Sequence, residues 1–77
     1  MEIDWLKDFL ALEEHGTFSR AADARNVSQP AFSRRIRALE DWIGAPLFRR
    51  GAQGAGLTLA GAHFKPLAGD LLRAIEQ

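Results

Sequence analysis

The side chains between positions 29 and 37 include the types that recognise nucleic-acid bases and phosphates. Glutamine can bind adenine through two hydrogen bonds, arginine can bind guanine in the same way, and serine can bind a base or a phosphate. No acidic residue interrupts this stretch before Glu40. The sequence therefore predicts a surface that contacts DNA, with an ordinary solvent-exposed helix face as the alternative. The side chains concerned are Gln29, Ser33, Arg34 and Arg37.

Catalytic and metal-binding side chains are scarce. The chain contains no cysteine and no tyrosine, and its two histidines, His15 and His63, are far apart. His15 follows two glutamates at a helix end, and His63 has no partner at the spacing of metal ligands. Neither a G-x-G-x-x-G nor a G-K-[ST] motif occurs. We therefore expect no enzymatic activity, no cofactor and no metal site.

Charge is distributed unevenly along a chain whose formal net charge is zero. Residues 1–18 carry five acids and one base, residues 19–50 carry seven arginines and three acids, and residues 51–77 are balanced. Arginine suits both phosphate groups and guanine edges because its planar guanidinium offers paired donors. The middle segment therefore has the charge of a nucleic-acid-binding surface, and chance clustering on a solvated surface is the alternative.

The size and composition are those of one folded domain. The chain has 77 residues, of which 47% are hydrophobic and 26% charged. Without cysteines, stability has to come from packing or from self-association. No apolar run approaches the ~20 residues that span a bilayer, and the N-terminal segment is acidic rather than basic. We expect a cytoplasmic protein with no membrane partner.

Hydrophobic periodicity predicts four helices, of which the first two are separated by a glycine. The first covers residues 4–15 and ends at Gly16, where glycine accepts a left-handed conformation. The second is short, covers residues 20–25 and has Ser19 as its expected N-cap. It is too short to be stable without tertiary contacts, so it must pack against another helix.

The third helix is predicted over residues 29–43, after a polar turn over residues 26–28. Ser28 can cap it, and Pro30 is tolerated in its first turn, where an N–H has no intrahelical partner. Gly44 and Pro46 end it. The apolar stripe that holds this helix to the core consists of Phe32, Ile36, Leu39 and Ile43, and we also expect Trp5 and Trp42 in the core.

Two strands, over residues 47–50 and 57–59, are expected to pair through a glycine-rich tip over residues 51–56. A fourth helix, capped by Thr58, covers residues 59–77. Its glycines and its proline lower its intrinsic stability, so it should need a partner surface, and a second copy of the chain is the simplest one. The apolar residues expected at this dimer contact are Phe64, Leu67, Leu71, Leu72 and Ile75.

The order of these elements predicts a mainly helical fold, a winged helix-turn-helix with a three-helix core and a two-stranded wing. Free N–H groups at the start of the third helix favour a phosphate, and Ser19 and Arg20 can act in the same way at the start of the second. Such a domain places its third helix in the major groove of DNA.

The remaining arginines have two possible roles each. Arg35 and Arg37 can contact phosphates, or they can be solvated or paired with the acids at positions 40 and 41. Arg49 and Arg50 lie on a strand, where charge also discourages edge pairing. We expect Arg50 to be the one that faces away from the core and, with Gly51 in the tip, to approach the DNA backbone or minor groove.

Spaced motifs extend over the whole chain, and such a string is more specific than one short motif. They are Phe18-Ser19-Arg20-Ala21-Ala22, Val27-Ser28-Gln29-Pro30-Ala31-Phe32-Ser33-Arg34, Ile36, Leu39-Glu40, Gly44, Leu47-Phe48 with Arg50, and Leu57-Thr58 with Ala60-Gly61. This string resembles the amino-terminal winged helix-turn-helix of LysR-type transcriptional regulators. Within that family, residues 25–40 most resemble the hypochlorite-responsive subgroup of enteric bacteria.

The resemblance implies promoter binding as a dimer, or as a tetramer in a full-length parent, with the last helix linking two subunits. It implies a DNA-binding domain over residues 1–58 and a linker or dimerisation helix over residues 59–77. Gln29, Pro30, Ser33 and Arg34 fall on the family's recognition-helix contacts, and Arg50 falls at its wing base.

Two departures from the family pattern stand out. Most members have leucine where this chain has Arg25, so the short helix either buries less or offers an extra cation to the DNA backbone. The family's long effector-binding domain is absent, so we expect an excised or truncated DNA-binding part.

The sequence thus predicts a protein that binds double-stranded DNA sequence-specifically and, as a two-fold dimer, reads paired half-sites. The alternative is a small helical protein-interaction or oligomerisation module that does not bind DNA. The predicted DNA contacts are Ser19, Arg20, Ser28, Gln29, Pro30, Ser33, Arg34, Arg37, Arg50 and Gly51.

Overall fold

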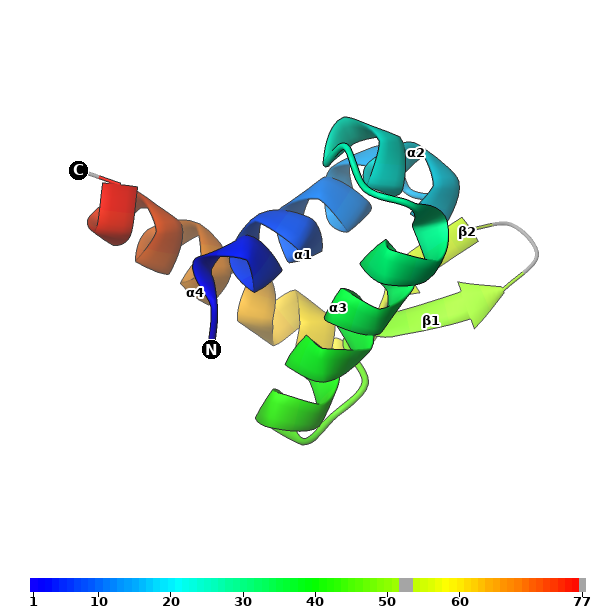
Figure 1. Ribbon diagram of the computed structural model, residues 1–77. Helices are drawn as coiled ribbons and strands as arrows, with labels where there is room; N and C mark the ends of the chain where they lie inside the picture. The colour runs from blue at the N-terminus through cyan, green and yellow to red at the C-terminus, as the bar shows by residue number, and fades with distance from the viewer. Residues whose placement is uncertain (52–53, 77) are drawn as a thin grey trace.

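Helices account for most of the chain in the computed structural model, which describes residues 1–51 and 54–76. The elements in this part are α1 (Ile3–His15), α2 (Phe18–Ala24), α3 (Gln29–Ile43), β1 (Phe48–Gly51), β2 (Gly54–Leu57) and α4 (Leu59–Glu76) (Figure 1). The predicted mainly helical winged helix-turn-helix is confirmed. No helix among these residues combines the length and the apolar character that crossing a bilayer requires.

The helix α1 supplies one wall of the core and ends where a glycine permits it. Leu6, Phe9 and Leu12 are fully buried on one side of the helix, as their helical spacing predicts. Gly16 adopts φ +78°, and its N–H donates to the carbonyl oxygen of Leu12. Trp5 is partly buried against the same core, which agrees with its expected place.

The helix α2 starts earlier than expected, at Phe18 rather than Arg20. Thr17 is its N-cap instead of Ser19, because Thr17 has the extended backbone of a cap and its Oγ1 accepts from the N–H of Arg20 at 3.2 Å. Inclusion of Phe18 lets its ring pack edge-on against Phe32 of α3, with ring centres 6.1 Å apart. This contact is one of those that stabilise so short a helix.

The helix α3 begins and ends as predicted. Ser28 caps it through an Oγ that accepts from the N–H of Ala31 at 3.2 Å, and Gly44 ends it in a left-handed conformation. Its apolar stripe is fully buried at Phe32, Ile36 and Leu39 and partly buried at Ile43. The expectation for Trp42 was wrong: this side chain is 60% exposed, because it lies on a flank of α3 that the described elements leave uncovered.

The wing is a two-stranded antiparallel sheet, longer toward its tip than expected. Phe48 lies opposite Leu57, and the pairing continues to Gly51 opposite Gly54, so the six-residue tip was wrong. Residues 52 and 53 of that tip lie outside the described residues. Gly54 adopts φ +110°, which favours glycine. The backbone N–H of Ala55, the next residue, donates to the carbonyl oxygen of Gly16 at 2.9 Å. This bond ties the wing to the loop between α1 and α2.

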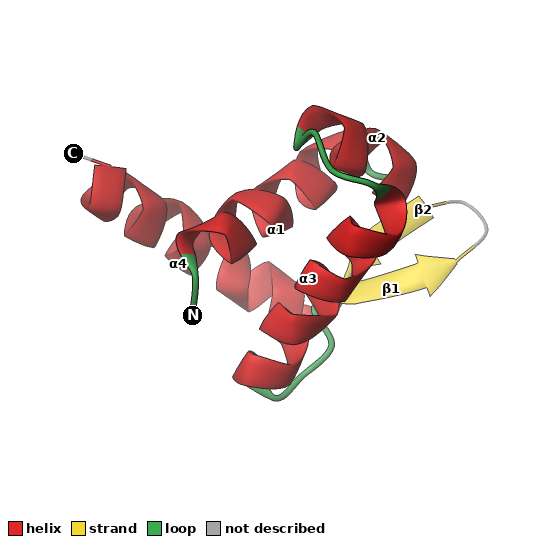
Figure 2. Cartoon of the chain, viewed as in Figure 1, coloured by secondary structure: helices red, strands yellow, loops and turns green. Residues whose placement is uncertain are grey.

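The helix α4 begins at the predicted cap and packs against α1. The Oγ1 of Thr58 accepts from the N–H of Gly61 at 3.0 Å, and Phe64 meets Phe9 edge-on at 5.0 Å between ring centres. Ion pairs from Lys7 to Glu76 and from Lys65 to Glu13 show that α4 runs antiparallel to α1. Figure 2 shows the last turns of α4 extending past the three-helix core.

Candidate nucleic-acid interface

The first turns of α3 stand at the surface, opposite the buried stripe that anchors this helix. Gln29, Pro30, Arg34 and Arg37 are exposed and Ser33 is partly buried. None of these side chains makes a hydrogen bond or an ion pair to another side chain in residues 1–51 and 54–76. The structure therefore presents this set of predicted contacts to solvent, where a partner can reach it.

A shallow depression lies where the starts of α2 and α3 meet the wing, beside the first turns of α3. It brings together four of the predicted site residues, although they come from three separate elements. Because donors from the helix α3, the helix α2 and the wing converge there, one ligand surface can contact all three. The residues that line the depression are Thr17, Phe18, Ser19, Gln29, Arg50, Gly51 and Gly54.

Arg50 is held by two contacts inside the chain. Its Nη2 donates to Glu40 Oε1 at 3.0 Å, and its guanidinium carbon lies 5.2 Å from the centre of the Phe18 ring. The expectation that Arg50 rather than Arg49 faces away from the protein is therefore corrected. Side chains alternate along a strand, so Arg50 lies on the same face as Phe48 and Arg49 on the opposite one, although both arginines remain exposed to solvent.

Glu40 is the buried carboxylate that joins α3 to the wing. Its side chain is 8% exposed, and its Oε2 accepts from the backbone N–H groups of Leu47 and Phe48 at 2.7 and 3.2 Å. With Arg50 on its other oxygen, the carboxylate satisfies the first amides of the wing and one wing arginine at once. The wing is thus fixed relative to α3. Glu40 was one of the two acids considered as possible partners of Arg35 and Arg37, and the structure pairs it with Arg50 instead.

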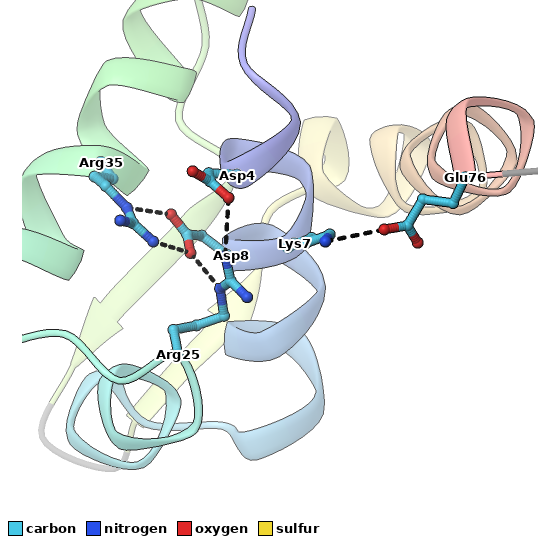
Figure 3. Close-up of polar contacts among 6 residues, drawn as sticks. All are labelled: Asp4, Lys7, Asp8, Arg25, Arg35 and Glu76. Atoms are coloured by element: carbon cyan, nitrogen blue, oxygen red, sulfur yellow. Dashed lines mark hydrogen bonds and ion pairs between the residues drawn. The ribbon is translucent and has the colours of Figure 1, made fainter.

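A second buried carboxylate, Asp8 on α1, binds two arginines (Figure 3). Arg35 donates to both carboxylate oxygens at 2.6 Å, and Arg25 donates to Oδ1 at 2.8 Å. The hydrogen bonds that Arg35 donates to Asp8 raise the pKa of Arg35, against the lowering effect of its burial. Arg25 also reaches Asp4, at 3.3 Å.

This cluster was missed at the level of sequence and corrects two expectations. Arg25 is turned toward α1 rather than offered to a DNA backbone, and Arg35 pairs with Asp8 rather than with Glu40 or Asp41. One sequence signal was available. Asp8 occupies a position on the buried stripe of α1, where a carboxylate needs a cationic partner.

The seven arginines of residues 19–50 thus divide into those that form ion pairs within the fold and those that form none among the described residues. Arg25, Arg35 and Arg50 are used inside the fold. Among the described residues, Arg20, Arg34, Arg37 and Arg49 form no ion pair, and all four are exposed. These four unpaired cations place positive charge at the surface of α2, α3 and the wing. The same part of the chain holds no cluster of histidine and acidic residues that could bind a metal ion.

The helix α4 carries an exposed apolar stripe on its outer side. Leu67, Leu71 and Ile75 recur every four residues and are 57%, 41% and 55% exposed. Leu72 is partly buried and lines a trough beside α1. Phe64, expected in the same contact, packs against the core of its own chain.

The chain is similar to known regulators over almost its whole length. It is 51% identical over 76 residues to the HTH-type transcriptional regulator YjiE of Escherichia coli K12, covering 99% of this chain and 25% of that protein. It therefore spans about a quarter of the length of that curated relative.

Two solved structures of regulators in complex with DNA have nearly the same fold. Vibrio fischeri DarR matches with a TM-score of 0.96 and 50% identity, over 99% of this chain and 26% of that one. The DNA-binding domain of CbnR matches with a TM-score of 0.95 and 38% identity, over 99% of this chain and 87% of that one.

The family model described as "Bacterial regulatory helix-turn-helix protein, lysR family" matches residues 3–62. That range runs from the start of α1 into α4 and includes the helix-turn-helix and the wing. The chain belongs to the LysR family of bacterial helix-turn-helix regulators.

Proposed function

We propose that this chain binds double-stranded DNA sequence-specifically by inserting the first turns of α3 into the major groove. The observation that carries the proposal is the exposed face formed by Gln29, Ser33, Arg34 and Arg37, whose amide, hydroxyl and guanidinium groups match the edges of bases. The buried stripe on the other side of α3 keeps this face outward.

The surroundings of α3 support contact with the DNA backbone. Arg20 is exposed on α2, and the backbone N–H of Gln29 at the start of α3 forms no hydrogen bond among the described residues, so it can bind a phosphate. Pro30 has no N–H, so it adds no unpaired donor to the first turn of α3. The similarity to DarR and CbnR, both solved with DNA, supports the same assignment.

The wing completes the proposed footprint beside α3. Arg50 and Gly51 line the depression that also contains Ser19 and Gln29, so a backbone that enters it passes the inner side of the wing. Arg49, exposed on the outer face, is a second cation within reach of a flanking phosphate or minor groove. Glu40 holds the wing in this place through Arg50 and the Leu47 and Phe48 amides.

We further propose that two chains pair through the outer stripe of α4. Leu67, Leu71 and Ile75 expose apolar surface in a line, and burial against a second copy removes that surface from water. Residues 59–77 then act as the dimerisation segment and residues 1–58 as the DNA-binding domain. A two-fold dimer reads half-sites separated by about one helical turn of DNA, or by a multiple of it.

In the whole protein we propose a bacterial transcriptional regulator of the cytoplasm, tetrameric at full length and without enzymatic activity. The names of its relatives support regulation rather than catalysis. We also propose membership of the hypochlorite-responsive subgroup, which rests on the resemblance of residues 25–40. A test of the subgroup is whether the chain binds operators of hypochlorite-responsive regulators in preference to operators of other family members.

Selection of bound duplexes from a random pool at two salt concentrations tests the DNA proposal. We expect one enriched motif with two related half-sites, and binding that weakens steeply as salt rises because phosphate contacts release counterions. A protein-interaction module would give no enrichment and no binding above background. That outcome would refute the proposed function.

A further inference from the structure

The fully buried carboxylate of Asp8 accepts hydrogen bonds from arginines on both sides of the turn between α2 and α3. Arg25 is the C-cap of α2, and Arg35 lies in the second turn of α3. Residues 26–34, which form the turn and the start of α3, separate them along the chain. Both guanidinium groups converge on Asp8, which is 0% exposed and belongs to α1 (Figure 3).

The contacts of this cluster are directional, unlike the apolar contacts around it. Arg35 binds Asp8 through two parallel hydrogen bonds of 2.6 Å, an arrangement that fixes the plane and the direction of the guanidinium. Phe32 and Ile36 bury apolar area against the core, and the hydrophobic attraction that results has no preferred direction. Rotation or sliding of α3 along α1 breaks the paired bonds before it exposes the apolar stripe.

Stability alone gives little reason for such a cluster. Burial of charges costs desolvation energy, and replacement of a buried ion pair by well-packed apolar residues is often neutral or stabilising. A helix that recognises bases has a different requirement, since its base-contacting side chains have to be held within about 0.5 Å of the positions in which they bind. Arg35 follows Arg34 directly, so whatever fixes Arg35 also fixes the exposed face of α3.

We propose that Asp8 is a positioning residue for DNA recognition. By fixing α3 relative to α2 through Arg35 and Arg25, it sets the sequence preference of the exposed residues of α3 without touching DNA. This inference rests on the proposed function. Its readout is the specificity ratio, defined as the Kd for a random duplex divided by the Kd for the selected duplex.

The specificity ratio separates positioning from stability. A role in stability alone changes the folded fraction, which scales both Kd values by the same factor and leaves the ratio unchanged. Loss of a surface charge likewise acts mainly on the sequence-independent part of binding. A shift of α3 instead weakens the selected duplex alone, because only that duplex depends on aligned base contacts.

The principal variant is Asp8→Asn, which keeps the shape and removes the charge that both arginines require. We expect its specificity ratio to fall by about tenfold or more, the size of a lost base contact. The matched control is Asp23→Asn, the same change at an exposed aspartate of α2, and we expect its ratio to stay within about twofold of the unmodified chain.

Two further variants keep the test decisive if Asp8→Asn unfolds. Replacement of Asp8, Arg25 and Arg35 together by leucine refills the site with apolar side chains, so we expect a thermal midpoint near that of the unmodified chain and a low specificity ratio. Arg35→Lys keeps the charge but lacks the planar fork, and we expect an intermediate ratio.

The inference is overturned if folded Asp8→Asn keeps the specificity ratio of the unmodified 77-residue chain within about twofold. Where Asp8→Asn unfolds, the inference is overturned if the triple leucine variant and Arg35→Lys both keep that ratio. If the unmodified chain shows no preference for any duplex, the proposed function fails instead. Unfolding of Asp8→Asn alone transfers the decision to those two variants.

Discussion

At the scale of single residues, the partner of each arginine decides which of them can bind DNA. Arg25 and Arg35 are held by Asp8, and Arg50 is held by Glu40, so these three serve the fold. Arg34 makes no ion pair in the described part of the chain and stands on the exposed face of α3. It is therefore the arginine best placed to read a base.

We expect Arg34→Ala to weaken binding to the selected duplex by ~1–3 kcal/mol and to relax the preference at one base pair. The reason is the loss of a bidentate contact to guanine. Kd values from fluorescence anisotropy against duplexes with single base changes measure both effects. Arg73→Ala, at an exposed arginine of α4, is the control. An unchanged preference at every base pair would remove Arg34 from the reading face.

Residue types and helical spacing were sufficient to predict the exposed face of α3, because both depend only on neighbours within a few turns. The ion pairs were not predictable in the same way. Asp8 binds partners 17 and 27 positions away, so its role depends on how α1 packs against α2 and α3. Arg50 was misassigned because the alternation of β1 starts at Phe48, which the sequence alone did not fix.

At the scale of elements, close backbone approach decides where α4 tolerates side chains. Gly61 is buried at the crossing of α4 over the start of β1, where an added Cβ would lie 2.1 Å from the carbonyl oxygen of Leu47. A Cβ added at Gly69, further along α4, would lie 3.4 Å from Nη1 of Arg73, which is ordinary van der Waals contact. The two glycines therefore have different consequences within one helix.

We expect Gly61→Ala to destabilise the fold by about 1–3 kcal/mol, because the backbone has to shift to admit the methyl group. We expect Gly69→Ala to stabilise it by about 0.5–1 kcal/mol, since alanine favours the helix and meets only a flexible side chain. Urea unfolding of both variants measures the difference. Equal effects in the two variants would contradict the crossing of α4 over β1.

Four predicted helix ends are found in the structure, with Thr58 at the start of α4 among them, and the predicted start of α2 was wrong. Gly16, Ser28 and Gly44 act as the sequence indicates, because a glycine or a serine satisfies a helix end by local geometry. The start of α2 was displaced by two residues, since Thr17 and Ser19 are both good caps and the packing of Phe18 on Phe32 selects the first. The wing extended further because glycine gives no signal of strand register.

At the scale of the whole molecule, two surfaces have different tasks. The positive face of α2, α3 and the wing is the surface proposed to bind DNA, and the exposed apolar stripe of α4 is the surface proposed to bind a second copy of the chain. Pairing doubles the DNA contact and fixes the spacing between two reading helices. Affinity for a two-half-site duplex should therefore depend on α4 although α4 makes no base contact.

We expect Leu71→Glu to shift the chain toward monomer, because a carboxylate in an apolar dimer contact is costly to bury. Affinity for the two-half-site duplex should fall while affinity for one half-site is unchanged. Sedimentation equilibrium and binding to both duplexes measure these effects, with Arg73→Glu as the control for added charge on α4. If Leu71→Glu and the unmodified chain form the same dimer, the proposed role of the apolar stripe of α4 is contradicted.

The most direct test of the central claim, that the first turns of α3 contact the bases, is the NMR spectrum of the chain with and without the selected duplex. We expect the largest changes at the side-chain amide of Gln29 and at the backbone signals of Ser33 and Arg34, and little change at Arg73 and Glu76 in the last turns of α4, which extend past the three-helix core. Changes elsewhere with Gln29, Ser33 and Arg34 unaltered would contradict it.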